Sequence, residues 1–257
     1  MLRKRIIFTL IYENGNFTQS RNFRLQKVGD IGWLEKFYKF QEIAFSLDEL
    51  IVLDATRGTR DQVNFAEALS RLVDDVFIPV SAGGGIRCIA DAEKYFNSGA
   101  DKIVVNTILH TDQKLVSELS KRYGAQSLIA SIDFKYIKGS NRVFIENGSG
   151  QISTELEEYV QNIERCGIGE IYLNSIDKDG TGFGYDFETI GTMSNSLGIP
   201  LIIAGGAGNS VHFEAGLNIN NVNAVATANL FNFIGNGLPL ARGNLIESGV
   251  NLANWKN

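Results

Sequence analysis

The segment Glu49-Leu-Ile-Val-Leu-Asp54 has a close counterpart about 121 residues further along the chain, Glu170-Ile-Tyr-Leu-Asn-Ser175. Each segment is a short apolar run that opens on a glutamate, and such runs are typical of strands buried in a parallel sheet. A unit that returns at a fixed interval indicates that the chain is built from two similar halves. Each half is too small to bury its own sheet, so we expect the two halves to close into one structure.

Two glycine-rich turns repeat at the same interval. Ile78-Pro79 leads into Gly83-Gly84-Gly85, and Ile199-Pro200 leads into Gly205-Gly206-Ala207-Gly208. Around them, short apolar runs alternate with longer amphipathic stretches, which is the pattern of parallel strands joined by helices. Strands are expected at 5–11, 49–54, 78–82, 102–106, 127–134, 170–175, 200–205 and 224–228. Helices are expected at 61–73, 90–97, 112–123, 154–165, 187–196 and 211–217.

A chain of 257 residues has the usual length of one eight-stranded α/β barrel. The sequence therefore predicts the α/β class and a single (β/α)8 TIM barrel with an internal half-barrel repeat. The barrel is expected to span residues 1–257, with half-barrels of roughly 1–123 and 124–257. The segment 138–151 is longer than most connections and contains Asn147-Gly148, so we expect a hairpin after the fifth strand, on the active face.

The composition excludes several classes of protein. The net charge is −5 and the isoelectric point about 5.2, whereas nucleic-acid modules usually carry a basic face. No segment approaches the roughly 20 apolar residues of a membrane span, and the first apolar run is too short for a secretion signal. We therefore expect a cytoplasmic protein that binds neither nucleic acid nor membrane. Cys88 and Cys166 stand in no metal or redox spacing, so a disulfide scaffold is excluded. No metal and no cofactor is expected.

The glycine runs are the clearest functional signal. In a barrel, both turns lie at the carboxyl ends of strands, where backbone N–H groups can approach a phosphate without Cβ obstruction. Tight-turn chemistry alone would explain one run, but two runs at the repeat interval favour binding of a small molecule with phosphates at both ends. The candidate phosphate-binding residues are Gly84, Gly85, Asn106, Thr107, Gly206, Gly208 and Asn229.

Carboxylates are expected on the same face. Asp133 falls where a strand end delivers its side chain to the barrel mouth, and it can serve there as a general acid or base. Asp54 ends the second strand in the same way. For Asp177 and Asp179, which follow the sixth strand, Asx-turn structure is as good an explanation as chemistry. Asp133 is therefore the candidate catalytic residue.

Charged residues open four strands at the opposite end of the barrel: Arg5, Glu49, Lys102 and Glu170. Two positive and two negative charges could close into a ring across the barrel bottom. Charges in a core cost desolvation free energy and persist only if they are mutually paired. The pattern alone favours a neutral, stabilising plug, because the bottom face of a barrel usually serves stability.

Six motifs run in order over nearly the whole chain. They are Met1-Leu-Arg-Lys-Arg-Ile-Ile7, Asp48-Glu-Leu-Ile-Val-Leu-Asp54, Val80-Ser-Ala-Gly-Gly-Gly-Ile86, Gly99-Ala-Asp-Lys102, Ser175-Ile-Asp-Lys-Asp-Gly-Thr181 and Ala204-Gly-Gly-Ala-Gly208. Together they resemble the HisF family, the synthase subunit of imidazole glycerol phosphate synthase. In that family a HisH glutaminase docks on the barrel bottom and releases ammonia, which travels through the barrel. At the top, ammonia reacts with a phosphorylated formimino substrate to give imidazole glycerol phosphate.

The resemblance gives the bottom charges a second interpretation. It implies that Arg5, Glu49, Lys102 and Glu170 form the family's ammonia gate rather than a plain structural plug. Asp101, beside Lys102, is a candidate docking carboxylate for a basic residue of a HisH-type glutaminase. The expected partners are therefore this glutaminase and a phosphorylated small molecule.

The top face departs from the family pattern. Ile11 replaces the family's catalytic aspartate at the end of the first strand, and Gln19 replaces a lysine that helps to hold the substrate. Asp133 matches the partner aspartate of the fifth strand, and Asn229 stands in place of a phosphate-site serine. An isoleucine can neither give nor take a proton, so its presence should lower the rate by roughly 10²–10⁴. The replacement leaves open whether the chain is an enzyme.

A retained gate with half of the acid–base pair missing resembles a divergent branch of HisF proteins. That branch is found with surface-polysaccharide (lipopolysaccharide) genes and is associated with acetamidino modification of sugars. The resemblance implies an ammonia-channelling barrel that supplies an ATP-dependent sugar amidotransferase. Two alternatives stay open: the cyclase subunit of imidazole glycerol phosphate synthase in histidine biosynthesis, and a non-catalytic scaffold for a glutaminase.

Overall fold

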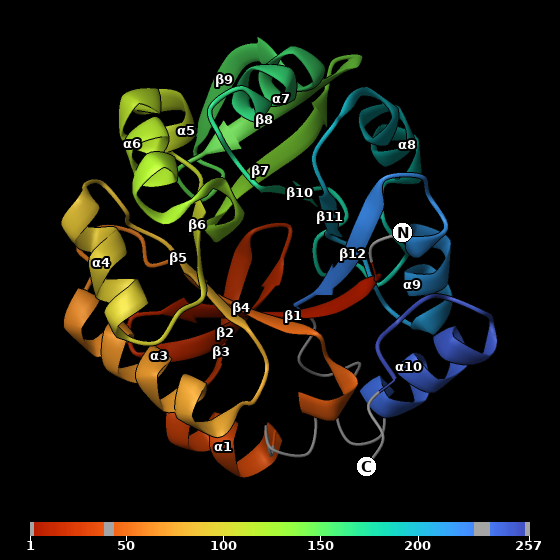
Figure 1. Cartoon of the computed structure of the whole chain (residues 1–257), viewed down its shortest axis with the longest axis horizontal. Coiled ribbons are helices and arrows are strands. Elements are labelled where there is room, and N and C mark those ends of the chain that lie inside the picture. Colours follow the sequence, from red (N-terminus) through yellow and green to blue (C-terminus); the bar gives the residue numbers. More distant parts are fainter. Residues whose placement is uncertain (1–2, 39–43, 229–236, 255–257) are drawn as a thin grey trace.

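The computed structural model of the chain describes residues 3–38, 44–228 and 237–254. Eight parallel strands form a closed barrel, and helices surround it as an outer ring (Figure 1). The barrel strands are β1 (Arg5–Glu13), β4 (Glu49–Asp54), β5 (Val80–Gly83), β6 (Lys102–Val105), β7 (Leu128–Ile137), β10 (Glu170–Ser175), β11 (Leu201–Ala204) and β12 (Val222–Thr227). The predicted (β/α)8 fold is confirmed.

Each barrel strand has a hydrogen-bonded neighbour on both sides. β1 pairs with β4 on one side and with β12 on the other, with Arg5 opposite Ala224 and Ile7 opposite Glu49. On the far side of the barrel, β7 pairs with β6 and with β10. The last strand thus returns to the first, and closure satisfies the backbone groups that an open sheet would leave at its edges.

The helices lie between the strands, on the outside of the barrel. They are α1 (Ile31–Tyr38), α3 (Gln62–Asp75), α4 (Ile89–Asn97), α5 (Ile108–Thr111), α6 (Gln113–Tyr123), α7 (Leu156–Glu164), α8 (Phe187–Ser196), α9 (Ser210–Leu217) and α10 (Gly237–Glu247), with 3₁₀ turns at η1 (Ala44–Ser46) and η2 (Ala125–Ser127). The six predicted helices agree within about two residues; α1, α5 and α10 were not predicted. In the described part of the chain, no helix has both the length and the apolar character needed to cross a membrane.

Side-chain caps set the start of two predicted helices. Asp61 accepts a hydrogen bond from the Asn64 backbone N–H at 3.0 Å, and Asp112 accepts one from the Leu115 N–H at 3.0 Å. The first N–H groups of a helix have no partner within the helix, so a carboxylate at this position satisfies one of them. These caps fix where α3 and α6 begin, at the carboxyl ends of the preceding strands.

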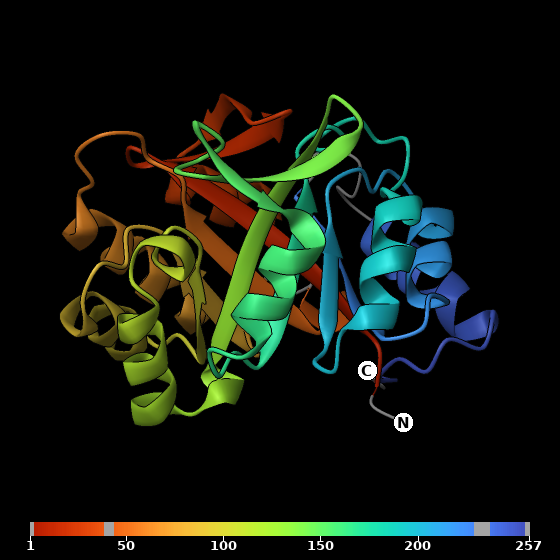
Figure 2. The same ribbon diagram turned by 90° about the horizontal axis from the view of Figure 1, so that it is seen from above.

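Two antiparallel hairpins extend the barrel at one end. β2 (Asn16–Arg21) and β3 (Arg24–Gly29) follow β1, whereas β8 (Ser140–Ile145) and β9 (Gly150–Glu155) follow β7. Figure 2 shows both hairpins at the end of the barrel opposite the two termini. The second hairpin was predicted, and the first was not. Because β1 and β7 continue into these hairpins, they run past their predicted ends, to Glu13 and Ile137.

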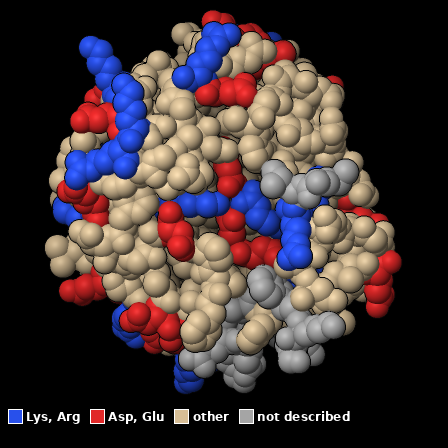
Figure 3. Space-filling model, in the orientation of Figure 1, with Lys and Arg blue, Asp and Glu red and all other residues tan. Residues whose placement is uncertain are grey.

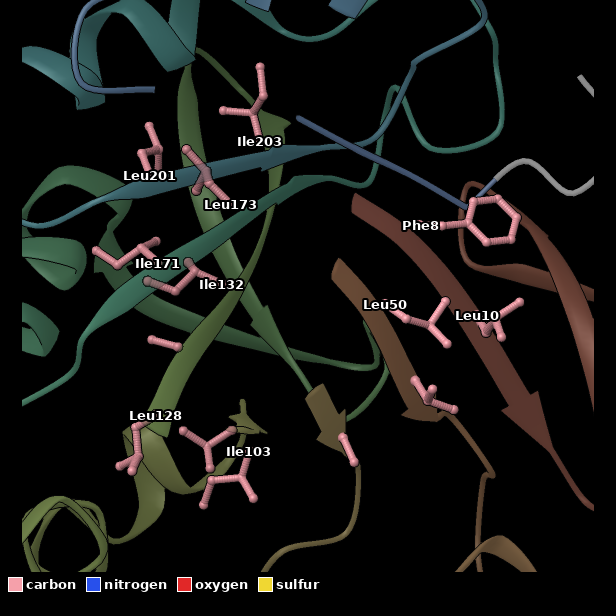
Figure 4. Packing of buried hydrophobic residues seen from close by; sticks show 14 of the residues in the cluster. Phe8, Leu10, Leu50, Ile103, Leu128, Ile132, Ile171, Leu173, Leu201 and Ile203 are labelled. Atoms are coloured by element: carbon pink, nitrogen blue, oxygen red, sulfur yellow. The ribbon is translucent and has the colours of Figure 1, made fainter. Parts of the chain in front are cut away.

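The barrel strands bury apolar side chains on both faces, since successive residues of a strand point to opposite sides. Figure 4 shows the outward-facing set, including Phe8, Leu50 and Ile171, which fills the layer between the sheet and the helices. A smaller cluster fills the inside of the barrel. Its members are Ile7, Ile51, Val104, Ile129, Tyr172, Ile202, Ala204, Ala224 and Ala226.

Tyr172 is the largest side chain of the interior cluster, and three of its companions there are alanines on β11, which pairs with β10, and on β12, the next strand after it. Small residues beside a large one let a barrel interior fill without voids. The Tyr172 hydroxyl is buried and shares a hydrogen bond of 3.2 Å with Thr9 Oγ1. The tyrosine therefore lies inside the barrel, one inward-facing position after Glu170, the charged residue that begins its strand.

A buried ion pair joins the last helix to the first strands. Arg242 of α10 holds Asp48 through both carboxylate oxygens at 2.9 Å each, and both side chains are almost fully buried. Asp48 also accepts the Ile6 backbone N–H at 2.8 Å. Such two-point contacts are geometrically specific. This pair therefore fastens the C-terminal helix to the bottom of the barrel where β1 and β4 begin.

We expect Phe8→Ala to lower the free energy of unfolding by about 3–5 kcal/mol, because it opens a cavity in a fully packed layer. Phe77→Ala is the matched control: its side chain is 88% exposed, so its effect should stay within about 0.5 kcal/mol. Urea denaturation followed by circular dichroism measures both. Equal effects of the two substitutions would contradict the packing described above.

Candidate functional site

A cavity of about 460 Å³ opens at the carboxyl ends of the barrel strands. This is the end at which (β/α)8 barrels carry their active sites. The sequence-predicted residues that line it are Gly84, Gly85, Asn106, Thr107, Asp133 and Gly206. Ile11 lines it as well, whereas Asn229 lies outside the described residues. The fold thus brings residues from both halves of the chain to one cavity.

The first glycine turn fits glycine alone. Gly84 has φ 111°, and a Cβ placed there would lie 2.2 Å from the carbonyl oxygen of Asp54. At Gly85, with φ 69°, a Cβ would lie 2.8 Å from Arg60 Cδ. Close backbone approach therefore explains this turn. It also places an arginine side chain directly against Gly85, which the sequence analysis did not anticipate.

The second glycine turn has a similar backbone but different surroundings. Gly206 has φ 112°, and a Cβ there would lie 2.1 Å from Gly184 O. Gly208 is not among the described residues that line the cavity, and its backbone N–H donates to His212 Nδ1 at 3.1 Å. That N–H is therefore already engaged within the protein. The two turns are alike in conformation and unlike in the donors that they present.

Asp133 is held by two amide side chains. Asn106 Nδ2 donates to one carboxylate oxygen and Asn174 Nδ2 to the other, each at 3.0 Å. Burial raises the pKa of Asp133 to about 7; the amide hydrogen bonds oppose this rise, while the charge of Asp179 adds to it. A carboxyl group with a pKa near neutrality can both give and take a proton at physiological pH.

Asn174 was missed by the sequence analysis, although a signal was present. It lies two residues after Tyr172 and four after Glu170, and alternate residues of a strand share one face. The alternation therefore predicts that Asn174 points into the barrel beside Asp133. The strand is otherwise largely apolar, and this pattern by itself indicates only a place in the sheet.

The residues that depart from the family pattern take different places. Ile11 lies on β1, pairs with Thr18 of β2 and lines the cavity. Gln19 lies on β2 opposite Gln26 and is not among the described residues that line the cavity. At the end of the first strand, the cavity is therefore lined by an aliphatic side chain that cannot exchange a proton.

The two loop carboxylates are used in structure. Asp179 is buried and accepts hydrogen bonds from the Ser20 hydroxyl and from the Phe23 backbone N–H at 3.1 Å. Burial raises the pKa of Asp179, and these hydrogen bonds only partly oppose it. Asp177 accepts the Tyr136 N–H at 2.9 Å. The loop after β10 is thereby fastened to both hairpins, over the rim of the cavity.

At the opposite end, the four predicted charges close into a ring. Arg5 contacts Glu49 at 2.6 Å and Glu170 at 2.7 Å, and Lys102 contacts the same two carboxylates at 3.3 and 2.8 Å. Figure 3 shows basic and acidic side chains gathered at the centre of this face. Each cation is therefore shared by two anions, and the ring spans the barrel axis.

The ring charges stabilise one another despite burial. Burial alone would raise the pKa of Glu170, but hydrogen bonds and charges from Arg5 and Lys102 lower it overall. Burial likewise disfavours the Arg5 charge, yet both glutamates together raise the pKa of Arg5. Beside the ring, Asp101 is exposed, and one of its carboxylate oxygens accepts the Val80 N–H at 2.8 Å. Arg5 and Glu170 thus remain charged at neutral pH.

Comparisons with known proteins agree with this architecture. The family model of histidine biosynthesis proteins matches residues 17–235. A protein of Parasynechococcus marenigrum, provisionally named imidazole glycerol phosphate synthase subunit hisF2, is 44% identical over 256 residues, covering 99% of this chain and 95% of that protein. The HisF subunits of imidazole glycerol phosphate synthase from Chloroherpeton thalassium and Sulfurisphaera tokodaii are 36% and 34% identical, over 97% of this chain and 98% of theirs.

The raised pKa of Asp133 predicts a characteristic dependence of stability on pH. Its pKa is about 7 in the folded chain and near 3.9 when unfolded, so the folded state binds the extra proton between these values. Stability from this group is therefore present below about pH 4 and is lost as the pH rises to 7, by at most about 1.4 kcal/mol per pH unit. Asp133→Asn should remove this loss, measured by urea denaturation from pH 4 to 8.

Asp74→Asn is the matched control for this measurement, because Asp74 is an exposed carboxylate of α3. It should retain the pH dependence of the unchanged chain. If Asp133→Asn and Asp74→Asn gave the same pH dependence as the unchanged protein, Asp133 would not titrate near neutrality.

Proposed function

The chain belongs to the histidine biosynthesis protein family, as a HisF-type barrel, and we propose that it conducts ammonia from a glutaminase to its upper cavity. The single observation that carries this proposal is the closed ring of Arg5, Glu49, Lys102 and Glu170 at one end of a barrel whose other end holds the cavity. The proposed partner below is a HisH-type glutaminase.

The space between the ring and the cavity suits a neutral molecule. The interior cluster is largely aliphatic, with Ile7, Ile51 and Val104 among its members. Ammonia is small and uncharged, so it can pass an apolar interior that excludes ions, which would have to lose their hydration. Tyr172 and Thr9 supply polar atoms at the floor of the cavity. Their hydroxyl groups can hydrogen-bond ammonia as it leaves the apolar segment.

The ring itself would act as the entrance. Because each glutamate is shared by Arg5 and Lys102, moving the flexible lysine side chain leaves both carboxylates paired with the arginine. Opening at Lys102 therefore costs less than opening at Arg5, which holds Glu170 through two hydrogen bonds. We propose that docking of the glutaminase, with Asp101 as one exposed contact, draws Lys102 aside.

The upper cavity would receive ammonia without performing the family's full chemistry. Asp133 is placed to move a proton, but the opposite wall presents Ile11, which cannot. We therefore propose that ammonia serves amidino-group formation on a sugar in surface-polysaccharide biosynthesis, completed by an ATP-dependent sugar amidotransferase. The phosphorylated acceptor would lie against the glycine turns. This role would be carried out in the cytoplasm, where the nucleotide-dependent partner works.

The gate is tested by coupling glutamine hydrolysis to product formation. The chain, its glutaminase and the sugar amidotransferase are mixed, and glutamate release is compared with amidinated product. Lys102→Met keeps the apolar stem but opens the ring, so glutamine use should continue while product per glutamine falls, because ammonia escapes to solvent. Lys121→Met, an exposed lysine of α6, is the matched control and should leave the ratio unchanged.

Two outcomes would overturn the channel. One is failure of the chain and the glutaminase to associate at micromolar concentrations. The other is stimulated glutaminase activity with no ammonia transferred, which would make the barrel a non-catalytic scaffold. If Lys102→Met and Lys121→Met gave the same ratio of product to glutamine, the ring would be structural only.

A second candidate function is the cyclase reaction of histidine biosynthesis, which the names of the relatives and the presence of Asp133 favour. With ammonium salts, we expect turnover of the formimino substrate at least about 100-fold slower than in a complete enzyme, because one proton-transfer group is missing. Ile11→Asp combined with Gln19→Lys should recover part of the rate. Near-normal turnover of the unchanged chain, or rescue of a histidine auxotroph, would favour this second function.

A further inference from the structure

The first hairpin, β2–β3, is basic although the chain as a whole has a net charge of −5. Residues 14–29 contain Arg21, Arg24 and Lys27 and no aspartate or glutamate. These three side chains are exposed, and Arg21 lies opposite Arg24 at the tip of the hairpin. Figure 2 shows this hairpin at the end of the barrel opposite the termini, and its residue Leu25 lines the upper cavity. The hairpin therefore carries positive charge along one edge of the cavity mouth.

Two more exposed arginines lie on the rim of this cavity. Arg57 Nη2 donates to Phe23 O of the hairpin at 3.2 Å, and Arg87 Nη1 donates to Ile86 O at 3.4 Å. Among the described residues that line the cavity, the one exposed acid is Glu146. Five exposed cations, none of which forms a salt bridge with a described carboxylate, make up what we call the basic rim: Arg21, Arg24, Lys27, Arg57 and Arg87.

Three aromatic side chains are exposed at the same end of the barrel, on its far side. Tyr136 is 61% exposed near the end of β7, Phe183 is 83% exposed in the loop after β10, and Phe187 is 38% exposed at the start of α8. Scattered exposed apolar residues are normal, whereas several that lie together mark an interaction site. We call these three residues the aromatic rim.

Contacts between the elements that carry the aromatic rim bring its members into one region. A Cβ placed at Gly184 would lie 3.5 Å from Phe187 Cε2, so the residue next to Phe183 lies against the Phe187 ring. Across the second hairpin, Tyr136 is paired with Asn141, whose Nδ2 donates to an α8 side chain, Thr189 Oγ1, at 3.0 Å. The end of β7, the loop after β10 and α8 therefore present a continuous surface.

The two rims are fastened to each other across the mouth. Asn22, between Arg21 and Arg24, donates through Nδ2 to Ile176 O and to Asp177 O at 3.0 Å each. Its backbone N–H donates to Asp179 O at 3.0 Å. These carbonyl groups belong to the loop that continues to the aromatic rim. A surface that is ordered before binding loses little conformational entropy when a partner docks on it.

This combination of side chains fits a protein with an acidic and partly apolar face. Arginine and aromatic residues are enriched in protein interfaces and among the residues that dominate their binding energy. Complementary charge steers such a partner and fixes its orientation. A second copy of this chain is a poor occupant of the same face, because a two-fold interface would place both basic rims in contact, and like charges facing each other are costly.

We propose that the basic rim and the aromatic rim form a docking surface for the ATP-dependent sugar amidotransferase, which covers the mouth of the upper cavity. The proposal rests on the proposed function in taking this mouth as the place where ammonia leaves the barrel. Ammonia that reaches an open cavity escapes to water, so a partner seated over the mouth has to be the enzyme that uses it. The chain would then hold one partner at each end of the barrel.

The test measures binding of the purified sugar amidotransferase to the immobilised full chain by biolayer interferometry, without glutaminase or glutamine. Arg21→Glu with Arg24→Glu should weaken binding at least about tenfold, mainly through slower association, because complementary charge acts on the rate of encounter. Phe183→Asp should weaken binding at least about tenfold through faster dissociation, because it puts a charge into an apolar contact. Added salt should weaken binding of the unchanged chain more than binding of the double variant.

Two control variants match these changes. Lys121→Glu with Arg165→Glu changes the net charge by the same amount, on exposed residues at the end of α6 and just after α7. Phe77→Asp changes an exposed aromatic residue that precedes β5, at the other end of the barrel. Neither control should alter amidotransferase binding, and circular dichroism checks that every variant is folded.

Amidotransferase binding that is unchanged in both rim variants would overturn the proposal. It would also be overturned by self-association of the unchanged chain that Phe183→Asp removes in sedimentation velocity, which would assign the face to a second copy. Binding to phosphatidylglycerol vesicles in place of the amidotransferase would assign it to a membrane, with the same consequence. Because no glutamine is present, rim-dependent docking without ammonia transfer would contradict only the channel. Ammonia transfer that persists in both rim variants would contradict only the docking surface.

Discussion

Closure of the sheet through the pairing of β1 with β12 is the constraint on which the rest of the molecule depends. Once the strands form a closed barrel, alternate residues of each strand must point inward. Their side chains therefore form successive layers inside the barrel. The charges open the strands at the bottom, the aliphatic residues and Tyr172 follow two positions later, and the amides that hold Asp133 come next. The site at the top and the ring at the bottom are therefore consequences of one register, and the Arg242–Asp48 pair holds that register at its start.

Much of this could be read from the sequence, because strand alternation and helix caps are local. The barrel strands and the membership of the charge ring follow from spacing alone. The first hairpin was missed although its signal is equally local: Asn14 and Gly15 both have positive φ, as a tight hairpin turn requires. The Asn14-Gly15 pair lies between β1 and β2, at the position where such a dipeptide favours a two-residue hairpin turn.

Other features could not be predicted, since they depend on the paths of loops through space. The contact of Arg60 with Gly85 joins residues on the loops after two different strands, and no spacing rule fixes which way a long side chain turns. The same holds for His212, whose ring captures the Gly208 N–H one turn into a helix. The glycines themselves indicate that another group lies close to the backbone. Which group that is depends on the three-dimensional fold.

Gly84 and Gly206 have nearly the same φ, and this similarity affects the orientation in which a ligand can bind. A barrel with two equal turns on opposite walls would accept a two-ended ligand in either of two poses related by a half-rotation. Only one pose would then present its reactive atom to the barrel interior beside Tyr172. The two walls differ, however. On one wall the Arg60 side chain packs against Gly85, and on the other the Gly208 backbone N–H is bound by His212, so the two poses are not equivalent. The differences between the two walls thus give a cavity with two similar glycine turns a defined direction.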